Sequence, residues 1–174
     1  MCELSTDVRS GKEGRNVRFY LFGGGVLIAD QLTKYLSLTY LSFQKPVRLI
    51  PSFFWFNLRY NSGAAFSLFS GYPFLLTIFT FLASVIIVVW GVRLPRNEKL
   101  MQAALGLIAG GASGNLLDRL FRGGLVVDFI DIHWLNKIHW PTFNLADSAI
   151  CIGVGLVLLD HILHLKKRDS NPKK

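Results

Sequence analysis

The sequence lacks the short motifs by which most enzyme classes are recognised. It contains no serine nucleophile elbow, no H-E-x-x-H helix and no phosphate-binding glycine loop. Its two cysteines, Cys2 and Cys151, lie far apart in the sequence and indicate no disulfide framework. His133 and His139 have no third ligand at a recognisable spacing, so the sequence predicts no metal site. Any chemistry is expected to come from carboxylates, amides and basic side chains, without a cofactor.

Charge is scarce in the interior of the chain, and long apolar runs take its place. Of the 174 residues 51% are hydrophobic and only 17% charged, which is too apolar for a soluble domain of this size. The apolar residues form four runs of about 20, the length that spans a bilayer. We therefore expect an all-α polytopic membrane protein with helices at about 19–38, 73–90, 100–120 and 143–165. These helices are expected to form a single domain, 19–165, between a polar tail, 1–18, and a basic tail, 166–174.

The two longer connections between these runs are rich in aromatic and β-branched residues. Val47–Ile50 and Phe53–Tyr60 predict short strands of a β-rich cradle at the membrane surface. Asn61–Gly63 indicates a turn, and the small residues Ala64–Ser67 after it suit either close packing or contact with a substrate. The aromatic segment Trp134–Trp140 predicts a short interfacial helix, which we expect to act as a lid.

The distribution of lysine and arginine predicts the topology. The net charge is +8, and the basic residues gather in the N-terminal tail, in the connection 91–99 and in the C-terminal tail. With four spans these three segments share one side of the membrane, and the positive-inside rule makes that side the cytosol. The basic residues therefore indicate orientation rather than binding of nucleic acid, and the two longer connections face outward.

With this topology, the polar residues of the apolar runs converge near the outer membrane boundary. Asp147 lies about four residues into the last run, roughly 6 Å along a helix axis. Ionisable residues in a membrane are costly and almost always face the protein interior or a water-filled cavity. One site is therefore expected, built from Asp30, Lys34, Asn115, Asp118, Arg119, Asn144 and Asp147, with Asn61 and Asp128 brought to the same level by the outward connections.

Several aspartates in one site suggest acid–base chemistry. Two adjacent carboxylates cannot both ionise easily, so they share a proton. Such a pair can activate water as a base and protonate a leaving amine as an acid. The spacing leaves the pair open, because Asp147 can meet Asp128, Asp118 or Asp30.

Two other functions are compatible with parts of the sequence. A small carrier or ion-conducting subunit would use Asp30, Lys34 and Asp147 as a proton path, and it requires polar residues throughout the bundle. An assembly protein would dimerise through the small-residue stripe of Gly106, Gly110 and Gly114. That function leaves Asp128 and Asp147 without a role.

The chain between Asp30 and Ile150 resembles the bacterial lipoprotein signal peptidases, also called signal peptidase II. The resemblance lies in five stretches, in the right order: Asp30–Lys34 (DQLTK), Asn61–Ser67 (NSGAAFS), Gly110–Arg119 (GGASGNLLDR), Val126–Phe129 (VVDF) and Phe143–Ser148 (FNLADS). Each stretch alone is a weak signal, but the five together are highly specific.

The resemblance implies a four-helix aspartic peptidase of the bacterial cytoplasmic membrane, and we expect the protein to be a monomer. Such enzymes cut the signal peptide from prolipoproteins just before a cysteine that carries diacylglycerol, and globomycin inhibits them. The catalytic pair of the family corresponds to Asp128 and Asp147. Residues that match or accompany the supporting positions are Asp30, Lys34, Asn61, Asn115, Asp118, Arg119 and Asn144.

Overall fold

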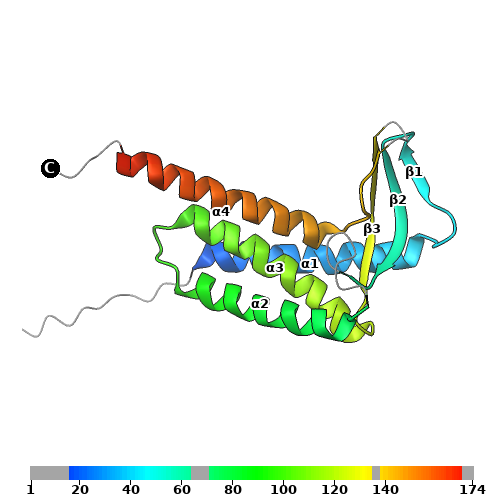
Figure 1. Cartoon of the computed structure of the whole chain (residues 1–174), viewed down its shortest axis with the longest axis horizontal. Coiled ribbons are helices and arrows are strands. Elements are labelled where there is room, and N and C mark those ends of the chain that lie inside the picture. Colours follow the sequence, from blue (N-terminus) through cyan, green and yellow to red (C-terminus); the bar gives the residue numbers. More distant parts are fainter. Residues whose placement is uncertain (1–15, 64–70, 135–137, 170–174) are drawn as a thin grey trace, which may run out of the picture.

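Four long helices lie side by side in a bundle, and a small sheet stands across one end of it (Figure 1). The computed structural model describes residues 16–63, 71–134 and 138–169. The helices are α1 (Val17–Tyr40), α2 (Pro73–Arg93), α3 (Lys99–Phe121) and α4 (Leu145–Asp169). The strands are β1 (Val47–Ile50), β2 (Phe54–Asn61), β3 (Val126–Trp134) and β4 (Ile138–His139).

The helices begin and end within a few residues of the predicted positions. Among the described residues, α2, α3 and α4 are long and apolar enough to cross a membrane. The polar residues Asp30, Gln31 and Lys34 interrupt the apolar run of α1, which is not among these candidates. The fourth span therefore stays a prediction. The loop Ala64–Ser67, for which the sequence allowed either close packing or contact with a substrate, lies outside the described residues. So does the predicted N-terminal tail up to residue 15, whereas Asn16 is described and Val17 and Arg18 belong to α1.

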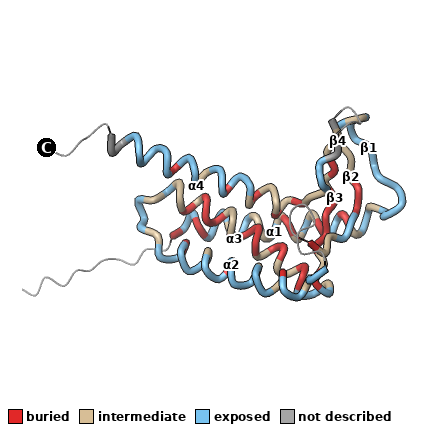
Figure 2. The backbone as a smooth tube through the Cα atoms, in the orientation of Figure 1, coloured by how far each residue is buried: buried red, intermediate tan, exposed pale blue. Residues whose placement is uncertain are grey.

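The helix α3 occupies the middle of the bundle and contacts the other three helices. Figure 2 shows buried residues along α3, whereas the outward faces of α2 and α4 are exposed. The exposed side chains on those faces are mostly large and apolar, such as Phe79 and Ile86 on α2 and Leu158 on α4. A bundle whose outer face is apolar suits a lipid surrounding.

Glycines on α3 let α1 approach closely. A Cβ atom at Gly106 would lie 2.7 Å from the carbonyl oxygen of Phe19, and one at Gly110 would lie 2.5 Å from that of Gly23. The same stripe continues at Gly114, which leaves room for the Asp30 carboxylate. The close helix packing predicted from the glycine spacing is thus confirmed, and it occurs within the chain rather than between copies.

The sheet is antiparallel in the order β1-β2-β3-β4. The predicted strands at Val47–Ile50 and Phe53–Tyr60 are confirmed as β1 and β2. The long strand β3 was not predicted, although the β-branched and aromatic residues that dominate Val126–Ile132 are a strand signal. The bridge between Ile130 and Phe143 joins β3 to the residue before the α4 cap.

The predicted interfacial helix over Trp134–Trp140 is wrong where the structure describes this segment. Trp134 ends β3, and Ile138–His139 form β4 on the edge of that strand. The backbone N–H of Trp140 donates to the carbonyl of Ile132, at 3.0 Å, so the exposed edge of β3 provides the hydrogen bonds that a helix would make internally.

The glycine stripe makes the bundle sensitive to the size of one side chain. Gly110→Val is expected to lower the stability of the protein in detergent by about 1–3 kcal/mol or more, because the added methyl groups press on the α1 backbone. Gly155→Val is the matched control, since Gly155 on α4 has nothing within 4 Å of an added Cβ. Thermal unfolding measures both, and equal melting temperatures for the two variants would contradict the close α1–α3 packing.

Candidate functional site

The nine predicted site residues meet where the bundle abuts the sheet. They come from five elements and the α4 cap: Asp30 and Lys34 from α1, Asn61 from β2, Asn115, Asp118 and Arg119 from α3, Asp128 from β3, Asn144 before α4 and Asp147 within it. Hydrogen bonds and ion pairs join all nine, through the backbone at some steps. The convergence inferred from topology is therefore present in the geometry, while the catalytic and supporting roles stay predictions.

Asn144 connects the two aspartates of the resemblance. Its side-chain amide donates to Asp128 Oδ1 at 2.7 Å and also contacts Asn115 Oδ1 at 3.1 Å. Its side-chain oxygen accepts from the backbone N–H of Asp147 at 3.0 Å, and its own N–H donates to Asp147 Oδ2 at 3.2 Å. One residue thus orients both carboxylates.

The contacts between Asn144 and Asp147 also explain why α4 begins where it does. Asn144 directly precedes the helix and Asp147 is its third residue, so their reciprocal bonds form a capping box. Such a box satisfies backbone N–H groups that the first helical turn leaves without partners. The cap therefore serves the fold and fixes the direction of the Asp147 side chain.

A second amide holds Asp128 from the sheet. Asn61, the last residue of β2, donates from Nδ2 to Asp128 Oδ2 at 2.9 Å. Its Oδ1 accepts from the backbone N–H of Gly63 at 2.9 Å, which fixes the amide with its NH₂ toward the aspartate. Asp128 is only 2% exposed and receives one amide on each oxygen.

Two residues of α3 extend this arrangement to Asp147 and to the loop after β2. Asn115 donates from Nδ2 to Asp147 Oδ1 at 2.8 Å. Arg119 is buried, and its guanidinium donates to the carbonyls of Gly63 and Asn115 at 3.1 and 3.4 Å. The positive charge of Arg119 also acts on the carboxylates of Asp147 and Asp128.

A buried ammonium group lies behind the two aspartates. Lys34 has no exposed surface, and its Nζ contacts Asp30 Oδ2 at 2.9 Å, Asp118 Oδ2 at 3.0 Å and Asn115 Oδ1 at 2.9 Å. Desolvating a charge is expensive unless it is paired and fully hydrogen-bonded. Three acceptors for the three protons of the ammonium group meet that requirement. Asp30 and Lys34 are four residues apart, a spacing that allows them to pair on one helix face, whereas nothing in the spacing indicates the participation of Asp118.

The carboxylate partners of Lys34 reach the backbone next to Asp147 and Asp128. Asp30 Oδ1 accepts from the N–H of Ala146 at 3.0 Å, one residue before Asp147. Asp118 Oδ2 accepts from the N–H of Val127 at 3.0 Å, one residue before Asp128. We call Lys34 and its acceptors Asp30, Asp118 and Asn115 the lysine cluster. This cluster connects α1 and α3 to the chain segments that carry Asp128 and Asp147.

Sequence reasoning missed Gln31, which helps to complete the lysine cluster. Its amide nitrogen contacts Asp30 Oδ2 at 3.2 Å and the carbonyl of Gly114 at 3.1 Å. A further contact, at 3.5 Å, reaches Asp118 Oδ1. Its position beside Asp30 on the polar end of α1 was the available signal.

The surroundings of Asp128 raise the pKa of its carboxyl to about 7. Burial contributes most, because it disfavours the charged form, and the negative charge of Asp147 adds to it. The amides of Asn61 and Asn144 and the charge of Lys34 oppose this rise, since each stabilises the ionised carboxylate. A carboxyl group with a pKa near neutrality can both hold and release a proton at working pH.

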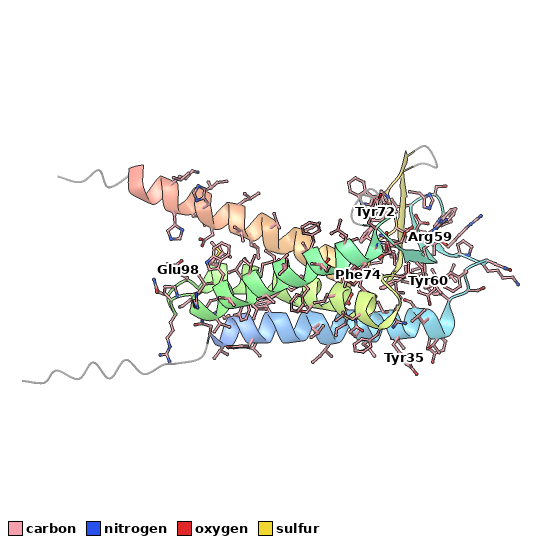
Figure 3. All side chains as sticks on the ribbon, turned by 60° about the horizontal axis from the view of Figure 1, so that its bottom comes forward. Tyr35, Arg59, Tyr60, Tyr72, Phe74 and Glu98 are labelled. Atoms are coloured by element: carbon pink, nitrogen blue, oxygen red, sulfur yellow. The ribbon has the colours of Figure 1, made fainter. Side chains whose placement is uncertain are left out.

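The histidines do not form a metal centre with these aspartates in the described part of the chain. His133 Nε2 lies 3.1 Å from Asp131 Oδ1 on β3. Within the described residues, the one group of three side chains close enough to share an ion is Glu98, Asp160 and His164. Glu98 lies at the end of the bundle opposite the sheet (Figure 3), far from the candidate site.

The fold and the site define a polytopic membrane protein built around two aspartates that are linked through one asparagine. Residues 24–163 match the family model described as Signal peptidase (SPase) II. The chain therefore belongs to the signal peptidase II family, a family of peptidases, and the resemblance identified from the sequence is confirmed. The family and the candidate spans together make it a bacterial membrane protein.

Individual relatives agree with this assignment over most of the chain. The lipoprotein signal peptidase of Coxiella burnetii (strain RSA 331 / Henzerling II) is 44% identical over 142 residues, which are 79% of this chain and 85% of the relative. That of Pseudomonas putida is 42% identical over 148 residues, 83% of this chain and 86% of the relative. A solved structure of a bacterial membrane enzyme, 35% identical, superposes with a TM-score of 0.75 over 90% of this chain and 92% of that one.

The lysine cluster predicts a strong dependence of stability on one buried cation. Lys34→Met is expected to lower the free energy of unfolding by about 3–5 kcal/mol, because it leaves Asp30 and Asp118 buried without their counter-ion. Lys99→Met, which removes an exposed lysine at the other end of α3, is the matched control. Denaturation in detergent measures both variants, and a Lys34→Met protein as stable as the control would contradict the role of this cluster.

Proposed function

We propose that this chain is an aspartic endopeptidase that removes the signal peptide from diacylglyceryl-modified prolipoproteins, with cleavage just before the lipidated cysteine. The observation that carries the proposal is the linked pair of Asp128 and Asp147, oriented by Asn144 at the sheet end of an apolar bundle. Membership of the signal peptidase II family and the lipoprotein signal peptidases among its relatives support the substrate class.

In this mechanism the two aspartates share one proton, which Asp128 holds at the start. Asp147 accepts a proton from a water molecule whose oxygen bonds to the scissile carbonyl carbon, while Asp128 donates its proton to the carbonyl oxygen. The C–N bond then breaks, and the leaving amine takes the proton from Asp147. A hydroxyl of the former carbonyl carbon returns a proton to Asp128, so both carboxyl groups end as they began.

The geometry supports these separate roles. Asp128 is buried with its pKa near 7, which suits a group that must carry a proton at neutral pH. Both oxygens of Asp147 accept hydrogen bonds, from Asn115 Nδ2 and from the backbone N–H of Asn144. A carboxylate held as an acceptor on both oxygens is oriented to receive a proton from water.

We propose four membrane spans, with both termini in the cytosol and the pair near the extracytoplasmic face of the cytoplasmic membrane. Figure 3 shows exposed Tyr35, Tyr60, Tyr72 and Phe74 near the sheet, as expected for an interfacial aromatic belt. Basic residues cluster at the opposite end, which Glu98 marks in Figure 3: Arg93 ends α2 and Lys99 begins α3. This agrees with the positive-inside rule. The helix α1 runs along α3 and directs Asp30 and Lys34 inward, which makes a fourth span acceptable in lipid.

This depth matches the proposed substrate. Its scissile bond lies between an apolar signal helix and a cysteine with two acyl chains, so it lies at the outer boundary of the bilayer. A pair of aspartates at the junction of bundle and sheet meets the bond there, where water still arrives. We expect globomycin to occupy the same site and the protein to act as a monomer.

The alternative of a proton-conducting carrier is less compatible with the bundle interior. Phe19, Leu105 and Ala109 form an apolar core cluster between the site and the opposite end, with Ile108 packed against it. A proton path would require polar groups or water across that layer. The peptidase needs them only at the sheet end.

Cleavage of a diacylglyceryl-modified prolipoprotein by the purified chain tests the proposal directly. The wild-type protein is expected to release the signal peptide, with the lipidated cysteine as the new N-terminus, and to leave the unlipidated precursor intact. Asp128→Asn and Asp147→Asn are each expected to reduce the rate by about 10³-fold or more, since each removes one acid–base group. Product mass and N-terminal sequence report the outcome.

Asp160→Asn, which alters a buried aspartate at the opposite end of α4, serves as the control and is expected to retain activity. Full activity in either dyad variant would rule out the proposed pair.

A further inference from the structure

A second asparagine–aspartate pair joins β2 to β3 beyond the proposed dyad. Asn57 donates from Nδ2 to Asp131 Oδ2 at 2.8 Å, and both residues are buried, at 6% and 1% exposure. This bond repeats the one between Asn61 and Asp128, which measures 2.9 Å. The site described above uses the bond between Asn61 and Asp128 and leaves the bond between Asn57 and Asp131 without a role.

The spacing of the two pairs differs between the strands. Asn57 and Asn61 are four residues apart on β2, whereas Asp131 and Asp128 are three apart on β3. Three residues along a strand reverse the face, so the two aspartates point to opposite faces of β3. In a regular strand, Asn57 and Asn61 would lie on the same face of β2 and could not each contact one of these aspartates.

A bulge in β2 resolves this mismatch. Phe56 pairs with Ile130 and Arg59 pairs with Asp128, so β2 advances three residues while β3 advances two. The extra residue lies at Asn57 and Leu58, which are both buried although they are neighbours in a strand. A bulge interrupts the backbone ladder locally, so cross-strand side-chain contacts take a larger share in holding the two strands together at this point.

Side chains on the same face protect the bond of Asn57 from water. Trp55 is the cross-strand partner of Asp131, and its ring stacks against His133 at 4.1 Å between centroids. The guanidinium of Arg48 from β1 also lies over the Trp55 ring, 4.6 Å from its centroid. The ring of His133 reaches back to Asp131, at 3.1 Å. The four residues form a layer across β1, β2 and β3.

We infer that Asn57 and Asp131 are positioning residues, whose hydrogen bond fixes the bulged register of β2 against β3 and so aims the Asn61 amide at Asp128. The inference rests on the proposed function, in which Asp128 is the acid. Neither residue is expected to touch the substrate. Their effect on the reaction passes through Asn61.

The pH dependence of the reaction reports this effect. The Asn61 amide stabilises the ionised form of Asp128 and thereby lowers the pKa of that carboxyl. Loss of the bond therefore raises the pKa, and the fall of activity at high pH, where Asp128 loses its proton, moves to higher pH. The charged groups around Asp128 stay unchanged by this loss. Those whose charge interacts with its carboxyl are Asp147 on α4, Lys34 on α1 and Arg119 on α3. Asp118 on α3 pairs with Lys34, and Arg59 on β2 is the cross-strand partner of Asp128.

The test compares four variants by the pH profile of kcat/KM for cleavage of a diacylglyceryl-modified prolipoprotein. Asn57→Ala removes the donor without changing charge and is expected to move the basic limb upward, by about half a pH unit or more for a loss of roughly 0.7 kcal/mol. Asn61→Ala is expected to move it in the same direction. The double variant Asn57→Ala/Asn61→Ala is expected to match Asn61→Ala alone, because Asn57 acts through Asn61. Asn97→Ala, at an exposed loop position, is the control and is expected to keep the wild-type profile.

A basic limb unmoved by Asn57→Ala, or additive shifts in the double variant, would overturn the inference. A lower rate with an unmoved limb would also overturn it, since that result indicates a purely structural role.

An exchange variant covers the case in which Asn57→Ala fails to fold. Asn57→Asp combined with Asp131→Asn keeps the net charge and again places one amide opposite one carboxylate. It is expected to restore the wild-type pH profile. A folded exchange variant whose basic limb lies at the same pH as that of Asn61→Ala would overturn the inference. A wild-type chain that does not cleave contradicts the proposed function itself, which separates the two failures.

Discussion

The pairing of the buried Lys34 ammonium group is the interaction on which the site depends. Its three acceptors come from α1 and α3, and two of them are carboxylates that also bind the backbone before Asp147 and before Asp128. The cost of burying one cation and two anions is met only when every partner is in place. The same condition therefore sets the positions of α4 and β3 relative to the central helices.

This arrangement gives two nearby carboxylates different surroundings. Asp128 lies on the sheet, enclosed by protein and held by Asn61 and Asn144, and burial with the charge of Asp147 brings its pKa near neutrality. Asp147 lies in the first turn of α4, within a capping box. Two titratable groups in unlike environments are the arrangement from which acid and base roles arise. Asn144 is hydrogen-bonded to both Asp128 and Asp147 and so connects the two environments.

Much of the site could be predicted from the sequence, because its physical causes are local. The apolar runs predicted the positions of the helices, and the glycine spacing predicted the contact of α3 with another helix. The distribution of basic residues predicted the topology, and with it that Asp30, Asn115 and Asp147 lie at the same depth in the membrane. Pairing between distant segments could not be read in this way. The expectation that Asp147 pairs with Asp128 rested on the family resemblance. The ion pair between Lys34 and Asp118 could be seen only in the folded bundle. The expected helix at Trp134–Trp140 failed because the edge of β3 offers backbone partners that no local pattern reveals.

The coupling of the two aspartates is the central claim, and a titration of the Asp128 carboxyl tests it most directly. The ¹³C chemical shift of that carboxyl, followed against pH in the wild-type protein and in Asp147→Asn, gives its pKa in both. We predict a midpoint near 7 in the wild-type protein and a lower midpoint in the variant, because the neighbouring negative charge that raises the pKa has been removed. A midpoint near the ordinary 3.8 in the wild-type protein, or one that Asp147→Asn leaves unmoved, would contradict a coupled pair.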